Sequence, residues 1–200
     1  MKILTSWDDG CAEDFKMAEL LKKYELPGIF FIPTVTLLTV EEIKNLSHTY
    51  DIGGHTTTHP ADMKLLSDRA AYNEVHDNKI WLEEVIGKEV EWFCYPKGRY
   101  NQNTIEQVKK AGFKYARTTD IGNVLPCEPY RIRPAAHAYH RRKENEGVHW
   151  VTKAMQLYTL AKNSENSYYH IWGHSWEVEG LGLWDELEEL FKFIHADQRS

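Results

Sequence analysis

The chain has 200 residues, of which 42% are hydrophobic and 27% are charged, and its formal net charge at pH 7 is −6. These values are typical of one folded domain with its own core, and the negative charge argues against nucleic acid or an anionic membrane surface as a partner. Asp8 and Asp9 interrupt the place where a signal peptide would be apolar, and no apolar run approaches the length that spans a bilayer. Three cysteines without a CxxC spacing indicate neither a disulfide framework nor a zinc ribbon. We therefore expect a single cytoplasmic domain over residues 1–200, without direct insertion into a membrane.

The first half alternates short apolar strands with amphipathic helices. Hydrophobic patterning predicts strands at residues 3–7 and 29–32, the second as a continuous apolar run that is typical of a strand covered on both faces. Helical spacing predicts a helix from Phe15 that ends before Pro27 and Gly28. Capping residues predict two further helices, from Thr39 to Leu46 and from Ser67 to Gly87.

The second half repeats the alternation around one long irregular segment. Strands are predicted at residues 90–95, 113–116 and 168–172. Helices are predicted from Asn103 to Gly112, over 148–158 and over 183–194, whereas residues 120–147 are rich in proline and charge and favour a functional loop.

This order of elements predicts a parallel α/β sheet, either a barrel or a doubly wound layer. In both architectures ligands bind at the carboxyl ends of the strands. The pair Asp8–Asp9, the segment after Ile52, the pair Tyr95–Pro96 and His174 each follow a predicted strand. We therefore expect these groups to share one site.

The pair Asp8–Asp9 is the first candidate for chemistry. Neighbouring side chains of a regular strand point to opposite faces, but Gly10 lets the backbone leave strand geometry so that both carboxylates can reach one cavity. Beside a cation, one carboxylate can bind the metal while the other remains free as a base. The alternative is that Asp-Asp-Gly forms a turn before a helix.

His55 and His59 lie four residues apart in a Gly-Gly-His-Thr-Thr-Thr-His-Pro segment. Two imidazoles and one carboxylate are ligands that zinc prefers, and three protein ligands leave a coordination position open, as catalytic metal sites require. The alternative is a loop in which neither histidine binds a metal.

Two further regions carry histidines. His174 follows the last predicted strand and Gly173, where an imidazole can act as a general acid, whereas His170 on the strand favours a structural role in the core. The basic segment at residues 137–143 is either a solvated loop or a clamp for a phosphate or carboxylate of the substrate.

Taken in order, these segments resemble the polysaccharide deacetylase superfamily, the NodB-homology domain of the family 4 carbohydrate esterases. The family's first motif, Thr-Phe-Asp-Asp-Gly, corresponds to residues 5–10, and its His-(Ser/Thr)-x-x-His motif is matched in full by residues 55–59. Its Arg-x-Pro-(Phe/Tyr)-Gly motif aligns with residues 94–98, and its Leu-x-His motif aligns with residues 171–174 if one residue of variation is allowed. The resemblance spans residues 1 to about 176.

The resemblance implies a distorted (β/α) barrel with fewer than eight repeats. It implies that Asp9, His55 and His59 hold a divalent metal, usually zinc, that Asp8 is the general base and that His174 is the general acid. A backbone N–H near Tyr95 would stabilise the oxyanion. Substrate would contact residues that follow two strands, namely Tyr95, Trp172 and Trp176.

The implied function is metal-dependent removal of N-acetyl groups from an amino sugar or a surface-polysaccharide precursor. Two alternatives remain, a cyclic-amide hydrolase of the allantoinase type and a catalytically silent carbohydrate-binding homologue. The chain departs from the family at Cys94, where the third motif has an arginine that pairs with the base. Either another arginine (Arg117, Arg131 or Arg133) supplies that charge or the base is tuned differently.

Overall fold

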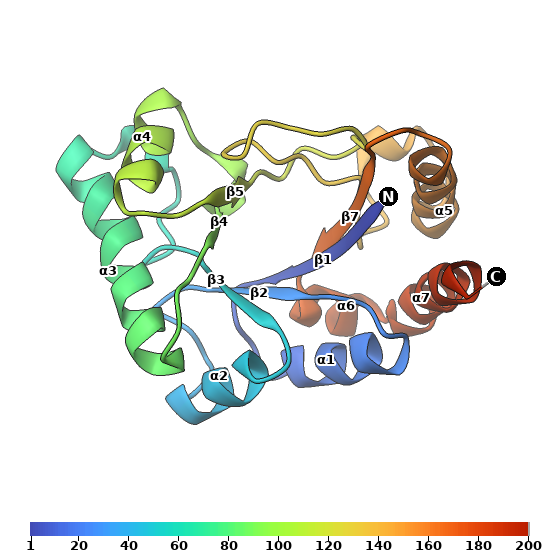
Figure 1. Ribbon diagram of the computed structural model, residues 1–200, viewed down its shortest axis with the longest axis horizontal. Helices are drawn as coiled ribbons and strands as arrows, with labels where there is room; N and C mark the ends of the chain where they lie inside the picture. The colour runs from blue at the N-terminus through green and yellow to red at the C-terminus, as the bar shows by residue number, and fades with distance from the viewer. Residues whose placement is uncertain (200) are drawn as a thin grey trace.

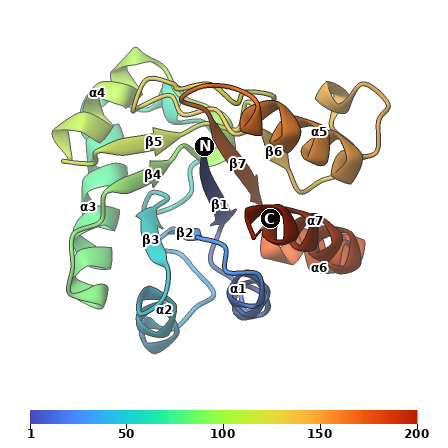
Figure 2. The same ribbon diagram turned by 45° about the vertical axis from the view of Figure 1, so that its right-hand side comes forward.

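A computed structural model describes residues 1–199 of the chain, and within them seven parallel strands form one sheet in the order β5-β4-β3-β2-β1-β7-β6. Figures 1 and 2 show that the sheet curls into an incomplete barrel with the helices on its outside. The strand bounds are β1 Lys2–Asp8, β2 Ile29–Ile32, β3 Asp51–Gly54, β4 Trp92–Cys94, β5 Tyr115–Arg117, β6 Ala136–His137 and β7 Tyr168–Gly173. The predicted distorted (β/α) barrel with fewer than eight repeats is confirmed.

The helices cover the outer face of the sheet (Figure 1). Their bounds are α1 Asp14–Lys23, α2 Val40–Ser47, α3 Asp68–Ile86, α4 Gln102–Lys110, α5 Trp150–Lys162, α6 Ser175–Leu181 and α7 Trp184–Gln198. Helices α1 to α5 lie between strands along the chain, and α6 and α7 follow the last strand. Short 3-10 turns lie at η1 Met63–Leu65, η2 Pro96–Gly98 and η3 Lys143–Asn145. None of the helices within residues 1–199 is both long enough and apolar enough to cross a membrane.

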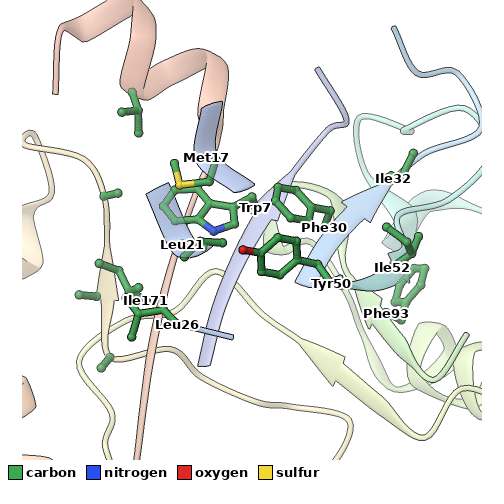
Figure 3. Close-up of a cluster of buried hydrophobic side chains, with 14 of the residues drawn as sticks. Trp7, Met17, Leu21, Leu26, Phe30, Ile32, Tyr50, Ile52, Phe93 and Ile171 are labelled. Atoms are coloured by element: carbon green, nitrogen blue, oxygen red, sulfur yellow. The ribbon is translucent and has the colours of Figure 1, made fainter. Parts of the chain in front are cut away.

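The outer face of the sheet carries the main core. Trp7 and Phe30 on adjacent strands pack with Met17 and Leu21 of α1 in one buried cluster (Figure 3). All four residues of β2 are buried, as expected for a strand covered on both faces. Each large side chain buried in this way contributes about 1.5–3 kcal/mol. A smaller cluster of Ile29, Phe31 and Cys94 lies apart from this core.

The segment 129–135 joins the two edges of the open barrel. On one side it pairs with β5, where the Ile132 amide donates to the Ala116 carbonyl (2.9 Å) and the Thr118 amide donates to the Ile132 carbonyl (2.9 Å). On the other side the Ala135 amide donates to the His170 carbonyl of β7 (2.7 Å). Irregular chain therefore closes the barrel where β5 and β6 do not pair.

The helix caps show where local sequence was informative. Thr39 and Glu42 form the predicted capping box of α2, and Gly87 ends α3 in a left-handed conformation. The predicted start of α4 at Asn103 is wrong by two residues, because Asn101 accepts the Thr104 amide hydrogen and forms the capping box instead. The strand β6 and the helix α6 were not predicted; both are short, and β6 lies inside the segment expected to be a loop.

Candidate functional site

The two aspartates after β1 reach one site because the backbone turns sharply there. Asp9 and Gly10 have positive φ values of 83° and 67°. A Cβ atom on Gly10 would lie 2.5 Å from Oγ1 of Thr36, which donates a hydrogen bond to the Gly10 carbonyl. Glycine is therefore required at this turn, and Asp8 and Asp9 can leave the alternation of a regular strand.

Asp8 is buried in the barrel against an arginine from another strand. Arg117 of β5 contacts both carboxylate oxygens of Asp8, and its guanidinium also lies 2.8 Å from the Cys94 sulfur. Burial alone would raise the pKa of Asp8, but the charge of Arg117, with those of nearby histidines, outweighs it and holds the pKa below its usual value. Asp8 is therefore an ionised carboxylate in a buried position.

The position of Arg117 accounts for the missing arginine of the third motif. Cys94 and Arg117 are register partners in the parallel pair β4–β5. Arg117 lies on the strand next to that of Cys94, and from there its guanidinium reaches the Asp8 carboxylate. The other two candidates do not take this place: Arg131 pairs with Gln102 and Glu128 instead, and Arg133 is exposed.

Asp9, His55 and His59 come together as the motif predicts. Oδ1 of Asp9 lies 3.4 Å from Nε2 of His55 and 3.5 Å from Nε2 of His59. His55 donates from Nδ1 to the carbonyl of Cys94 (2.8 Å), which leaves the lone pair of Nε2 directed at the same place. One carboxylate and two imidazoles with ligand atoms within 4.8 Å of one another form a donor set that fits a divalent cation such as zinc.

The loop that carries both histidines is fixed by helix α3. The His55 amide donates to Asn78 Oδ1 (2.9 Å), and the Thr58 amide donates to the Glu74 carboxylate (2.8 Å). His59 has a positive φ of 52°, and its amide donates to the hydroxyl of Thr56 (3.1 Å). Burial lowers the pKa of His59, and so does the charge of His55. A neutral imidazole is the form that binds a metal.

His174 occupies the opposite side of this site. It follows β7 directly, with Nε2 3.8 Å from Oδ2 of Asp9 and Nδ1 3.2 Å from Oε2 of Glu177. Burial lowers its pKa, but Glu177 and the two aspartates outweigh burial and raise the pKa above the usual value. A histidine with a raised pKa that faces the site is suited to donate a proton.

A cleft of about 440 Å³ opens beside Asp9 and His59 and is lined by Val35, Leu37 and Trp176 among others. Trp176 is 46% exposed, and its indole N–H donates to Oδ2 of Asp9 (3.1 Å). An exposed indole beside the site can stack on the apolar face of a sugar ring.

The other two predicted substrate contacts need correction. The side chain of Tyr95 is fully buried and Trp172 is 3% exposed, so neither ring offers a surface to a sugar. The Tyr95 amide donates to the Arg117 carbonyl (3.2 Å) and is therefore not free for an oxyanion. Whether another backbone N–H near Tyr95 stabilises the oxyanion stays a prediction.

Two predictions about other basic residues are settled by their contacts. His170 is fully buried with Nε2 2.8 Å from the Ser6 hydroxyl, which confirms its structural role. In the basic segment 137–143, Arg142 donates through Nε to His137 and through NH2 to the Thr119 carbonyl. Two sides of its guanidinium are thus engaged by the protein itself, so the clamp for a substrate anion is not favoured.

Sequence reasoning missed Glu177 and His137. Glu177 stands three residues after His174 at the start of a helix, a spacing at which side chains meet, so this signal was present. His137 lies in a two-residue strand 37 residues before His174, and no local pattern connects them.

Comparison with known proteins finds related sequences and structures. Residues 2–116 match the family model of polysaccharide deacetylases. The chain is 28% identical over 127 residues to the "Putative polysaccharide deacetylase YxkH" of Bacillus subtilis (strain 168), covering 60% of this chain and 45% of that protein. It is 22% identical over 126 residues to a poly-beta-1,6-N-acetyl-D-glucosamine N-deacetylase of Staphylococcus aureus (strain MSSA476), covering 54% of this chain and 43% of that protein. The chain therefore spans less than half the length of these curated relatives.

A solved structure shows the same fold over nearly the whole chain. The Xyl-CE4 domain of a multidomain xylanase from the hindgut metagenome of Trinervitermes trinervoides superposes with a TM-score of 0.70 at 13% identity. The superposition covers 98% of this chain and 84% of that domain.

Proposed function

Because the chain belongs to the polysaccharide deacetylase family, we propose that it is a metal-dependent hydrolase that removes N-acetyl groups from an amino sugar or a surface-polysaccharide precursor. The observation that carries the proposal is the meeting of five side chains at the carboxyl ends of three strands. They are a buried ionised carboxylate, three metal-type ligands and an imidazole with a raised pKa, namely Asp8, Asp9, His55, His59 and His174.

We propose that Asp9, His55 and His59 hold the metal, with zinc as the ion that their oxygen and nitrogen donors suit. When bound, a divalent cation polarises the acyl carbonyl and makes a water molecule more acidic. Trp176 donates to Asp9 and orients this ligand while offering its exposed face to the sugar.

The protein's own acid and base complete the reaction. Asp8, kept ionised by Arg117, accepts a proton from the water that attacks the acetamide carbon. His174 donates a proton from Nε2 to the departing amine nitrogen, with Glu177 on its other ring nitrogen. The C–N bond breaks, and acetate and a free amino sugar leave.

We infer that the whole chain acts as one catalytic unit. The family match ends at residue 116, but His174 and Glu177, which complete the site, come from the segment beyond it. A chain cut after residue 116 would keep the metal ligands and lack the acid.

The proposal is tested by acetate release from N-acetylated sugars, short oligosaccharides and nucleotide sugars, with zinc-loaded and chelator-treated protein. Asp8→Asn is expected to retain the metal and to lose about 10²–10⁴-fold in turnover, the range that general acid–base catalysis contributes. Asp51→Asn, an exposed aspartate at the opposite end of β3, is the matched control and is expected to keep full activity. Full activity of Asp8→Asn would contradict the assignment of the base.

Cyclic amides and a sugar-binding assay, added to this panel, separate the two alternatives. Ring opening of cyclic amides without acetate release would favour the allantoinase type. Sugar binding without turnover would favour a silent homologue. The main argument for a catalytically silent homologue was the absence of an arginine at position 94. The contact of Arg117 with Asp8 removes that argument.

A further inference from the structure

His137 lies beside the site in a strongly constrained position. Its ring is parallel to that of Trp172, with ring centroids 3.9 Å apart and planes 4° apart, and its side chain is buried. Nε of Arg142 donates to Nδ1 of His137 (3.0 Å), and the same guanidinium donates to the Thr119 carbonyl (3.3 Å). Stacking and this anchored donor therefore fix both the plane and the rotation of the imidazole.

The hydrogen bond from Arg142 also determines the tautomer of His137. An arginine has no acceptor, so Nδ1 of His137 must offer a lone pair, and a neutral ring then carries its hydrogen on Nε2. Burial lowers the pKa of His137 to about 4, so the neutral ring is the form present at pH 7. Nε2 is buried and faces Oε2 of Glu177 at 3.3 Å, and no aligned hydrogen bond within residues 1–199 satisfies this atom.

Glu177 is shared by two histidines through a single oxygen. Oε2 lies 3.3 Å from Nε2 of His137 and 3.2 Å from Nδ1 of His174. With His137 on one side, this oxygen cannot turn away from His174 without giving up a buried partner. His174 is then held with Nδ1–H on the carboxylate and with Nε2 facing Asp9.

We propose that His137 and Arg142 are positioning residues that fix the orientation and tautomer of His174 through Glu177. The proposal rests on the proposed function, in which Nε2 of His174 protonates the leaving amine. Neither residue touches the reacting atoms; their effect is to keep Nε2 of His174 available for that proton.

A second metal ion is the competing use of this cluster. Ligand atoms of His137, His174 and Glu177 lie within 4.8 Å of one another. A cation on Nε2 of His137 would require its hydrogen to move to Nδ1, where the N–H of Arg142 already points. The arrangement in which the Nε2–H of His137 faces the Glu177 carboxylate is therefore the one that the donors favour.

Two substitutions at position 137 separate donation from packing. His137→Phe keeps a flat ring against Trp172 but has no N–H, whereas His137→Gln can place an amide N–H near Glu177. Arg142→Met removes the donor that sets the tautomer. Arg141→Met is the matched control, because the exposed Arg141 bonds only to His140 among the contacts that residues 1–199 give it.

The first readout is the pair of ring nitrogen chemical shifts of His174 in ¹⁵N-labelled protein, assigned by their loss in His174→Asn. At a pH high enough for the His174 ring to be neutral, we expect a single Nδ1–H tautomer in the unsubstituted protein, in Arg141→Met and in His137→Gln, and a mixture of tautomers in His137→Phe and Arg142→Met. An unchanged His174 in both of the latter variants, in folded protein, would overturn the proposal. This readout needs no turnover, so it stands even where acetate release fails and the proposed function falls.

The second readout is steady-state kinetics. Where the protein releases acetate, kcat of His137→Phe is expected to fall about tenfold with KM unchanged, a part of the 10²–10⁴-fold that a general acid contributes. His137→Gln is expected to recover most of that loss. An equal loss in both variants, or a second zinc equivalent bound by the unsubstituted protein and lost in both, would show a packing or metal role instead.

Discussion

The proposed base, Asp8, and the proposed acid, His174, are held by different kinds of contact. We call the surroundings of Asp8 the base side of the site and those of His174 the acid side. Asp8 is buried and meets one fully buried cation, Arg117, at both carboxylate oxygens. His174 is 20% exposed at its side chain and is oriented through a carboxylate, Glu177, that a further histidine holds. On the base side the partner neutralises a buried charge, whereas on the acid side the partners select the orientation of a ring.

This difference predicts which quantity a substitution will change: the stability of the fold on the base side and turnover on the acid side. Loss of the partner of a buried charge leaves an uncompensated ion and lowers the stability of the fold. Loss of an orienting contact at a partly exposed ring leaves the fold intact and lowers turnover.

The largest effect is expected for Arg117→Met. With Asp8 buried and unpaired, the free energy of unfolding should fall by about 3–5 kcal/mol, the cost of breaking a buried ion pair. Urea denaturation measures it, and Arg131→Met, which removes an arginine that is 42% exposed at its side chain, is the control.

A double variant tests whether a guanidinium at position 94 can replace that of Arg117. Because Cys94 and Arg117 are register partners, the double variant Cys94→Arg with Arg117→Met places a guanidinium one strand closer in the sheet. We expect it to recover part of the lost stability. Unfolding of Arg117→Met at the same urea concentration as the unsubstituted protein would contradict the whole account of the base side.

The same division explains what the sequence could predict. The metal ligands and the base lie within two short segments, where spacing alone brings side chains together: Asp8 and Asp9 at a strand end, His55 and His59 in one loop. Alternation of strands and helices likewise predicted a parallel α/β sheet, because most of the elements are long enough to show their period, whereas the barrel was implied by the family resemblance.

The partners of these residues depend on contacts that no local pattern encodes. Arg117 was one of three candidate arginines, and only the register of β4 against β5 selects it. His137 reaches Glu177 because the two-residue strand β6 pairs with β7, a length too short for a period to show. Tyr95 and Trp172 were expected to contact the substrate, but side chains at strand ends can equally be buried, as both of these are.

The second prediction concerns Asp14, whose carboxylate contacts the residue that follows His174. Its buried carboxylate accepts hydrogen bonds from the Cys11 amide (3.0 Å) and the Ser175 hydroxyl (2.5 Å), so it joins the start of α1 to the residue after His174. Burial is the largest effect on this group and raises its pKa from 3.8 to about 7. The folded chain therefore holds a proton on Asp14 at pH values where the unfolded chain has released it.

The sign of the pH dependence follows from linkage. The contribution of Asp14 to stability is complete below its unfolded pKa of 3.8 and is lost as the pH rises to its folded value of about 7. The loss is at most about 4 kcal/mol. In Asp14→Asn we expect the unfolding free energy to fall less steeply between pH 4.5 and 7.5 than in the unsubstituted protein, while the exposed Asp185→Asn keeps the full slope. Identical slopes in Asp14→Asn and the unsubstituted protein would show that Asp14 is ionised throughout this range.

The third and smallest effect is expected for Glu177→Gln, and it is a loss of turnover rather than of stability. The amide of glutamine offers one oxygen and one NH₂ group where two histidine N–H groups now meet a single carboxylate oxygen, so one of the two rings must turn or change its tautomer. We expect kcat for acetate release to fall about 10- to 100-fold, the range found when a supporting contact behind a functional histidine is lost. The unfolding free energy should change by less than about 1 kcal/mol, because the glutamine oxygen can still accept from one of the two rings and the His174 side chain is partly exposed. Glu179→Gln, two residues further along α6 with a carboxylate that pairs with Lys16 at the surface, is the matched control and should leave kcat unchanged.

Two results would contradict this prediction: a Glu177→Gln protein that unfolds much earlier than the unsubstituted protein, or one that keeps its full kcat. Either would mean that the acid side is organised like the base side, around a charge rather than around an orientation.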